Sequence, residues 1–244
     1  MRISDRQQQI LSILEKEGFC TSNQLSERTY TSPSSIRRDL AALHNLGLIT
    51  RTHGGASLTG SGTQAPALHS RMTKNVTEKR KIAKKAATFL KDDMSVMLDG
   101  SSTASFLLPY LAERKNISLF TNSLSTAMRA IEIGIKTHCL GGKAVRNSAV
   151  LAGEETCRAV SGLFVDILFF SSQSLDEQGL ISDSTEEENQ LRKQMLQQAR
   201  QRVFLCDSSK FNSRTLYTLT TLSHVDAAVF DQPFSGLTAN CMIL

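Results

Sequence analysis

The sequence predicts an α/β protein of two domains, in which an N-terminal winged helix-turn-helix domain precedes a larger α/β domain. Helical periodicity punctuated by capping signals fills residues 1–58, and short β-type runs alternate with helical stretches from residue 94 onward. The length of 244 residues is enough for two cores. A chain that is 40% hydrophobic and 21% charged is neither collagen-like, nor disordered, nor a coiled-coil rod.

Charge is distributed unevenly along the chain, although the formal net charge is only +5. Residues 1–58 carry seven Lys and Arg against five Asp and Glu, and residues 59–90 carry seven against one. The remaining residues, 91–244, carry 14 against 17 and are slightly acidic. This asymmetry indicates a polyanionic partner at the N-terminal end.

The cysteines and the hydropathy pattern indicate a cytoplasmic protein with no cofactor or metal. No CxxC pair and no histidine at ligand spacing is present, so reduced thiols are expected at all five cysteines. No apolar run reaches membrane-spanning length, and the N-terminus lacks the apolar region of a secretory signal. We therefore expect no membrane partner. The five cysteines are Cys20, Cys139, Cys157, Cys206 and Cys241.

Three capping signals place three helices in the first 58 residues. Ser4 and Thr21 are each followed three residues later by a glutamine, which is the pattern of a capping box. Gly18 offers a stop for the first helix. Ser32 precedes Pro33, which is tolerated in a first helical turn because its missing N–H has no partner there.

The third helix has one apolar face and one face suited to a DNA groove. Ile36, Leu40 and Leu43 follow helical spacing and define the buried face. The opposite face holds Arg38 among small and short polar residues, so its backbone can approach a major groove closely. Alternatively, the charges of this helix merely face water.

Residues 46–56 form two short extended runs around a glycine turn, which predicts a wing. Arg51 and His53 would reach the sugar-phosphate backbone or the minor groove from it. The predicted DNA-contacting residues lie on the third helix or the wing. They are Ser32, Ser34, Ser35, Arg37, Arg38, Arg51 and His53.

Two segments carry a family resemblance. The run SSIRRDL at residues 34–40, followed by LGLITRTHGGA at residues 46–56, resembles the N-terminal signature of the DeoR family of bacterial transcriptional regulators. In that family the segment is a winged helix-turn-helix, and IRRDL lies on the recognition helix. The resemblance implies double-stranded operator DNA as a partner.

The basic segment between residues 69 and 85 leaves two interpretations open. Residues 57–66 are rich in Ser, Thr and Gly, as in a flexible linker, and the helix that follows has an apolar stripe. The lysines of that helix then lie on a solvated face, or they contact DNA phosphates. We expect the DNA-binding domain to span residues 1–58, the linker residues 59–77 and the second domain residues 78–244.

The second domain alternates strands with helices, which predicts a mostly parallel sheet. Ligands of such sheets bind beyond the carboxyl ends of the strands. Three predicted strand ends, at residues 98–103, 121–123 and 206–211, bring hydroxyls and backbone N–H groups together, and the third adds Lys210. This chemistry suits a phosphate, although each loop taken alone is also typical of ordinary helix capping.

Residues 78 to about 230 resemble the DeoR-family C-terminal sensor domain, which is similar in fold to sugar-phosphate isomerases and CoA transferases, a Rossmann-like α/β arrangement. The resemblance implies a phosphorylated sugar as effector. Asp99 would bind sugar hydroxyls, the loop of residues 101–103 would hold phosphate or its neighbours, and the loop of residues 121–123 would line the other side. Gly142 would allow close backbone approach, and Glu188 and Lys210 would close the site. The implied effector residues are Asp99, Ser101, Ser102, Thr103, Thr121, Asn122, Ser123, Gly142, Glu188 and Lys210.

The chain departs from the family pattern at residues 171–174, which are Ser-Ser-Gln-Ser, and at Asn189 and Arg192. The expected function is a repressor of carbohydrate genes, acting as a homodimer or homotetramer and released from its operator by the phosphorylated sugar. One alternative is a regulator that has lost effector control. Another is an isomerase-like enzyme with Asp99 or Glu188 as general base. The presence of an N-terminal DNA-binding domain in the same chain favours sensing over catalysis.

Overall fold

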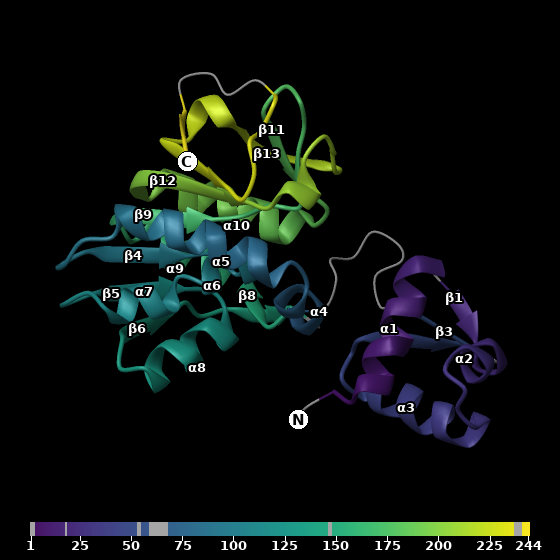
Figure 1. The fold of residues 1–244 in the computed structure, drawn as a ribbon. Coiled ribbons are helices and arrows are strands. Elements are labelled where there is room, and N and C mark those ends of the chain that lie inside the picture. Colours follow the sequence, from purple (N-terminus) through teal and green to yellow (C-terminus); the bar gives the residue numbers. More distant parts are fainter. Residues whose placement is uncertain (1–2, 18, 53–54, 59–67, 146–147, 237–240) are drawn as a thin grey trace. The chain divides into compact units, whose positions relative to one another are not determined.

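The structure is a computed structural model that describes residues 3–17, 19–52, 55–58, 68–145, 148–236 and 241–244. It divides into two compact units, residues 1–71 and 72–244. Figure 1 shows the helices and strands of each unit. In the described part of the chain, no helix is long and apolar enough to cross a membrane.

The first unit is a winged helix. Its three strands form an antiparallel sheet in the order β1-β3-β2, with β2 and β3 making the predicted wing. The three predicted helices are present, which confirms the winged helix-turn-helix. The elements are α1 (Asp5–Glu17), β1 (Phe19–Thr21), α2 (Ser22–Arg28), α3 (Pro33–Asn45), β2 (Ile49–Thr52) and β3 (Gly55–Leu58).

Side chains cap α2 and α3 as the sequence predicts. The hydroxyl of Thr21 accepts a hydrogen bond from the backbone N–H of Gln24 at 3.2 Å, and the Gln24 side chain accepts one from the Thr21 N–H at 2.8 Å. Ser32 caps α3, with proline in the first turn. Ile36 and Leu40 are buried on the inner face of α3, so the predicted phase of this helix is confirmed.

The alternative interpretation, in which the charged residues of the third helix all face water, is wrong for Asp39. Its side chain is buried and forms an ion pair with Arg6 of α1. The amide of Gln7 donates a second hydrogen bond to the carboxylate at 3.2 Å. The aspartate of the IRRDL run therefore joins α3 to α1 inside the unit.

The second unit is built on a seven-stranded sheet in the order β15-β14-β12-β9-β4-β5-β6. Every described neighbouring pair in it is parallel, which confirms the predicted parallel sheet. The strands are β4 (Ser95–Leu98), β5 (Ser118–Thr121), β6 (Lys136–Cys139), β9 (Val165–Phe170), β12 (Ala199–Cys206), β14 (Ala227–Phe230) and β15 (Met242–Ile243).

Alternate residues of the central strands enter two separate cores. On β9, for example, Phe169 packs in the core with α5, α7 and part of α8, whereas Phe170 packs in the core with α9 and α10. This alternation follows from the two-residue period of a strand covered on both faces. α4 (Leu68–Thr73) includes the boundary between the two units. The helices of the second unit are α5 (Val76–Ala86), α6 (Ser102–Ser105), α7 (Leu108–Ala112), α8 (Leu124–Glu132), α9 (Glu154–Ser161) and α10 (Glu186–Gln197).

Two smaller sheets and three 3-10 turns complete the second unit. The hairpin of β7 and β8 bonds to the loop after β5, since the N–H of Leu151 donates to the carbonyl of Asn122 at 2.7 Å. The remaining elements are β7 (Lys143–Val145), β8 (Val150–Ala152), β10 (Ser174–Leu175), β11 (Leu180–Asp183), β13 (Tyr217–Thr221), η1 (Ala87–Phe89), η2 (Ser208–Lys210) and η3 (Leu222–His224).

The described part of the predicted linker is helical, because α4 and the first residues of α5 lie between residues 68 and 77. Residues 59–67 lie outside the described residues. The interpretation that all the lysines of α5 face water is wrong for Lys79, which is only 4% exposed. Its ammonium donates to the carbonyl of Lys74 at 2.6 Å. Lys81 and Lys84 are exposed, as expected.

The strand order reverses between β4 and β9. From β4 the chain proceeds outward to β5 and β6, and it then returns to the other side of β4 to form β9. In open parallel sheets this reversal leaves a crevice at the carboxyl ends of the strands, where ligands bind. The loops after β4, β5, β9 and β12 meet at that edge.

Candidate functional site

The recognition helix presents a short cationic face. Arg37 and Arg38 of α3 are exposed, as is Ser34, while Ser35 is half-buried. Ser32 is exposed at the helix start, and its hydroxyl caps the helix by accepting from the N–H of Ser35. The small side chains around the arginines leave the α3 backbone accessible to a groove.

The wing adds one further cation to the described surface. Arg51 lies on β2 and is exposed. It pairs in register with Ala56 of β3, so it stands on a hydrogen-bonded strand rather than on a loop. His53 lies outside the described residues.

Asp99 is the centre of the predicted effector site and follows β4 at the switch point. Its carboxylate is buried and accepts three hydrogen bonds. The N–H of Ser101 donates to Oδ1 at 3.1 Å, while the N–H of Ser171 and the Nε of Arg192 donate to Oδ2 at 3.3 and 2.7 Å. Most of the acceptor capacity of this carboxylate is therefore already used.

Arg192 of α10 lies between three buried carboxylates. Beyond its bond to Asp99, it donates to Asp183 at 2.9 Å and to Glu188 at 3.1 Å. Burial alone would lower the pKa of Arg192, but these carboxylates raise it above its ordinary value. Burial raises the pKa of Asp183, an effect that Arg192 opposes and Glu188 and Asp99 reinforce. Glu188 thus serves as a partner of Arg192.

Ser171 connects Asp99 to Lys210. Its backbone N–H bonds to Asp99, and its hydroxyl accepts from the ammonium of Lys210 at 2.9 Å and donates to the carbonyl of Leu205 at 2.6 Å. Ser171 is one of the residues at which the chain departs from the family pattern. The departure is therefore built into the polar network of the site.

Lys210 is the partly exposed cation of this edge, with 21% of its side chain accessible. Besides Ser171, its ammonium lies 3.6 Å from the carboxylate of Asp207, the residue that follows β12. Burial raises the pKa of Asp207, but the charge of Lys210 and hydrogen bonds from neighbouring side chains outweigh burial and hold that pKa below its ordinary value. The pair is thus charged on both sides.

The hydroxyl loops after β4 and β5 are buried and largely occupied by capping. Ser101 caps α6, and Ser123 caps α8. The hydroxyl of Thr121 accepts from the N–H of Ser123 at 3.1 Å. The backbone carbonyl of Ser102 accepts a hydrogen bond from the Ser105 hydroxyl at 2.7 Å, inside α6. Ordinary capping, the alternative for each single loop, thus describes much of their bonding.

Two buried side-chain atoms of these loops, Oγ1 of Thr103 and Oδ1 of Asn122, have no hydrogen-bond partner among the described residues, and Oγ of Ser184 after β11 has none either. Thr103 and Asn122 are 1% and 4% exposed, so neither side chain is widely open to solvent. Buried polar atoms of this kind are uncommon and call for a bound water or ligand.

Gly142 follows β6 and has a structural reason to be glycine. Its φ of +123° is a left-handed conformation that other residues adopt only with strain. A Cβ atom there would lie 2.0 Å from the hydroxyl oxygen of Thr156 and 3.1 Å from the carbonyl of Ala152. The close approach that this glycine permits is to α9 and β8, and contact with an effector stays a prediction.

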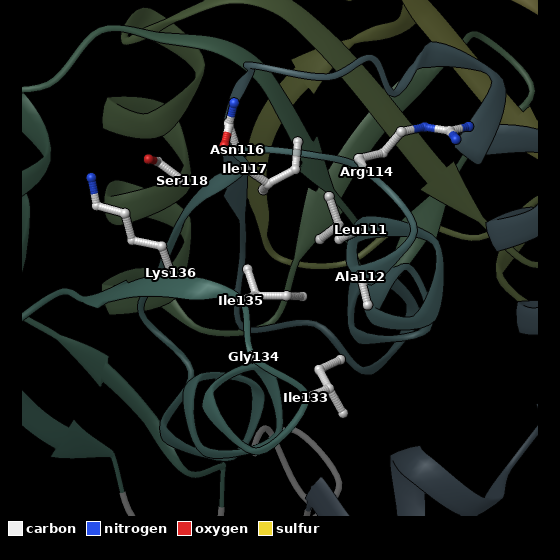
Figure 2. Close-up of a pocket in the computed structure, with 10 residues that line it drawn as sticks. All are labelled: Leu111, Ala112, Arg114, Asn116, Ile117, Ser118, Ile133, Gly134, Ile135 and Lys136. Carbon is white, nitrogen blue, oxygen red and sulfur yellow. The ribbon is translucent and has the colours of Figure 1, made fainter.

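A separate pocket of about 400 Å³ opens at the opposite edge of the sheet (Figure 2). It includes Ser118 and Lys136, the first residues of β5 and β6, and none of the predicted effector residues lines it. Two of its polar side chains have local partners: Arg114 donates to the carbonyl of Leu90, and Asn116 donates to Asp93. This pocket is therefore distinct from the switch-point site.

A winged helix with an exposed basic recognition helix, joined to an α/β unit with a polar switch-point site, defines a ligand-responsive class of DNA-binding regulator. The chain matches the DeoR-like helix-turn-helix domain over residues 6–61 and the DeoR C-terminal sensor domain over residues 74–232. It belongs to the DeoR family of transcriptional regulators. The resemblance and the function class expected from the sequence are thereby confirmed.

Three curated relatives are similar over most of their length. The transcriptional repressor GlcR of Bacillus subtilis is 30% identical, with 91% of this chain and 86% of the relative covered. The L-fucose operon activator of Haemophilus influenzae is also 30% identical, covering 93% and 91%. The glycerol-3-phosphate regulon repressor of Escherichia coli is 26% identical, covering 96% and 92%.

Among solved structures, ribose 5-phosphate isomerase A of Methanocaldococcus jannaschii is similar at 22% identity and a TM-score of 0.43. The likeness covers 57% of this chain and 55% of the isomerase. The curated relatives above are transcriptional regulators and not enzymes by name.

Proposed function

We propose that this regulator is a repressor that binds operator DNA through α3 and the wing, and leaves it when a phosphorylated sugar occupies the switch-point site. The position of Lys210 carries the effector half of the proposal. It is a charged, partly accessible ammonium at the carboxyl edge of a parallel sheet, where phosphates commonly bind. A lysine there offers a charge-assisted hydrogen bond to an anion.

The sugar contacts follow from which polar atoms are unoccupied. Asp99 already accepts three hydrogen bonds, so its main role is to fix the loops around it. Oδ1 of Asn122 and Oγ1 of Thr103 have no partner among the described residues and suit sugar hydroxyls. We place Ser101, Ser102, Thr121, Ser123, Gly142 and Glu188 in the wall and support of this site.

The relatives support a role in carbohydrate control but differ in its sign. Two of those above are named repressors and one an activator. We propose a cytoplasmic repressor that works as a homodimer or homotetramer, because one winged helix reads only a short half-site. Light scattering on the full chain tests this assembly, and a monomer at the concentration that binds DNA would contradict it.

The effector site is proposed to bind and not to catalyse. A general base must accept a proton from the substrate, but Asp99 already accepts three hydrogen bonds and both Asp99 and Glu188 are paired to the Arg192 guanidinium, which disfavours their protonation. Incubation with a phosphorylated sugar that binds the protein should leave the sugar unchanged by NMR. Product formation would restore the isomerase-like alternative.

The DNA half of the proposal is tested by Arg38→Ala. We expect specific operator binding to weaken by about 1–3 kcal/mol, because Arg38 reads base edges from the exposed face of α3. Fluorescence anisotropy with DNA from upstream of the chain's own gene measures the loss, and thermal unfolding checks the fold. Arg129→Ala, an exposed arginine of the second unit, is the control. Unchanged binding by R38A would remove Arg38 from the reading face.

The effector half is tested by Lys210→Ala in a thermal-shift screen of phosphorylated sugars. We expect at least one sugar phosphate to raise the melting temperature and to release DNA from the wild-type chain. K210A should keep its DNA affinity and lose both responses. The exposed Lys193→Ala variant on α10 should keep them. An effector response that survives in K210A would overturn the proposed phosphate site.

A further inference from the structure

Asp207 is shared between Lys210 and the segment by which the chain enters the second unit. One carboxylate oxygen, Oδ2, lies 3.6 Å from the Lys210 ammonium. The other, Oδ1, accepts a hydrogen bond from the Asn75 amide at 2.9 Å and another from the Ser209 hydroxyl. Asp207 is 1% exposed, so water does not compete effectively for these bonds.

Asn75 lies between α4 and α5 and uses its side chain in an uncommon way. It occupies the cap position of α5 in a left-handed conformation, with φ +53°, and makes no side-chain capping bond. Its amide instead donates to Asp207 and to the Ser209 hydroxyl, both at 2.9 Å. The backbone turn that joins α4 to α5 is thereby attached to the loop that carries Lys210.

A second contact fixes the same turn. Lys79 of α5 is buried, and its ammonium donates to the carbonyl of Lys74, the residue before Asn75. Its positive charge also favours the ionised form of Asp207. The turn at residues 74–75 is therefore held from one side by α5 and from the other by the loop after β12.

We propose that Asn75 is a positioning residue that transmits occupation of the switch-point site to residues 68–75, through Asp207. The inference rests on the proposed function, since it takes an anion at Lys210 as the input. An anion beside Lys210 competes with Asp207 for the ammonium and repels the carboxylate. Asp207 then shifts, and the only amide in its described contacts, that of Asn75, shifts with it.

This arrangement has the elements that coupling requires. The two sites are distinct, and a single buried carboxylate contacts groups from both. Loss of the Asn75 contact removes the link between Asp207 and residues 68–75, while an anion keeps its own direct contacts with Lys210.

Asn75→Gly is the cleanest variant, because glycine keeps the left-handed turn without strain and removes only the amide side chain. Asn116→Gly is a matched control. Asn116 is also left-handed, with φ +56°, and its amide also donates to an aspartate, Asp93, at 2.7 Å. Any general effect of glycine at such a turn appears in both variants.

The experiment measures inorganic phosphate binding to the full chain by calorimetry, and amide hydrogen exchange of residues 68–75 with and without phosphate. Chloride at equal ionic strength is the reference. In the wild type and in N116G we expect phosphate to change exchange by about fivefold or more, the lower end of usual couplings. N75G should bind phosphate within about twofold of the wild type and lose the exchange response.

Asp207→Asn gives an independent measurement. It removes the negative charge that competes for Lys210, so phosphate should bind more tightly while the exchange response is lost. A merely structural role of Asp207 would not tighten phosphate binding. Should phosphate fail to bind the wild type, the anion site of the proposed function is wrong and this inference falls with it. Binding without an exchange response, or a response that N75G retains, overturns the coupling alone.

Discussion

The two units differ in how they treat polar side chains. In the described part of the first unit, Asp39 is the one polar or charged side chain that is buried, and the residues predicted to contact DNA are mostly exposed. In the second unit, the carboxyl edge of the sheet contains many buried polar groups. Asp99, Asp183 and Arg192 are each at most 6% exposed there.

This difference separates two ways of building a binding surface. The exposed side of α3, with Ser34, Arg37 and Arg38, consists of side chains that point into water. Each of them therefore contributes individually, and its removal leaves the fold intact. The effector edge is a network in which each charge depends on its neighbours, because an unpaired charge in the interior is costly. Substitutions of the buried charges at this edge should therefore affect stability and response together.

Arg192→Met tests this difference with the largest expected effect. It leaves the three carboxylates around Arg192 without their shared partner, and breaking a buried pair in this way costs about 3–5 kcal/mol. Urea unfolding of the full chain measures the loss. The control is Arg202→Met, since Arg202 pairs with Asp226 at the surface, with 35% and 38% of the side chains exposed.

The control variant should lose less than about 1 kcal/mol, as surface pairs usually do. Equal stability of R192M and R202M would mean that the carboxylates around Arg192 do not depend on it. The contrast between network and independent side chains would then fail.

Asp39→Asn tests the same contrast within the first unit, with an intermediate effect. The buried carboxylate of Asp39 accepts from Arg6 through one oxygen and from Gln7 through the other, whereas asparagine keeps only one acceptor oxygen, and the loss of one such hydrogen bond costs about 1 kcal/mol. We expect a lower melting temperature for the first unit and little change in the ratio of specific to nonspecific DNA binding. Asp5→Asn, at the exposed start of α1, is the control. A changed specificity ratio with unchanged stability would make Asp39 a DNA contact.

Asp183→Asn gives the smallest effect, a change in the pH dependence of stability. Burial raises the pKa of Asp183 above its ordinary 3.8, so the folded protein holds this proton more tightly than the unfolded chain. The resulting stabilisation is lost as pH rises from that value through the folded-state pKa. The stability of D183N relative to the wild type should therefore increase with pH over this window.

Asp166→Asn is a control of opposite sign. Hydrogen bonds from Ser95 lower the pKa of Asp166, so its stabilisation is present at higher pH and is lost as pH falls through the folded-state value. The free energy of unfolding of D166N, relative to that of the wild type, should therefore decrease as pH rises over this window. Denaturant unfolding at a series of pH values gives both slopes, and equal slopes would contradict the pKa directions.

Local signals in the sequence were sufficient for much of the fold. The capping pairs at Thr21 and Ser32, and the spacing of Ile36 and Leu40, predict helix ends and phase because those interactions span only three or four residues. The alternation of strands and helices likewise predicts the parallel sheet and the edge where its loops meet. Which loops become neighbours depends on the strand order, which the sequence alone does not reveal.

The partners of buried charges could not be predicted. Arg192 and Asp99 are 93 positions apart and meet only in the fold, where Arg192 of α10 reaches the residue that follows β4. The buried position of Lys79 was likewise not predicted, because Lys79 was grouped with the exposed lysines of α5. A charged residue on an otherwise apolar stripe, as Lys79 is relative to Ile82 and Ala83, is the signal that could have found it.

The parallel sheet also affects how such a sensor can diversify. Several side chains at the switch point, such as those of Asp99, Ser171 and Lys210, follow strands and do not belong to them, while alternating residues inside the strands fill the two cores. Ligand preference can therefore be changed by exchanging short loops, with the mechanical frame kept intact. A loop graft after β4 or β9 is the corresponding engineering route to a new sensor, provided that the grafted loop still supplies a partner for Arg192.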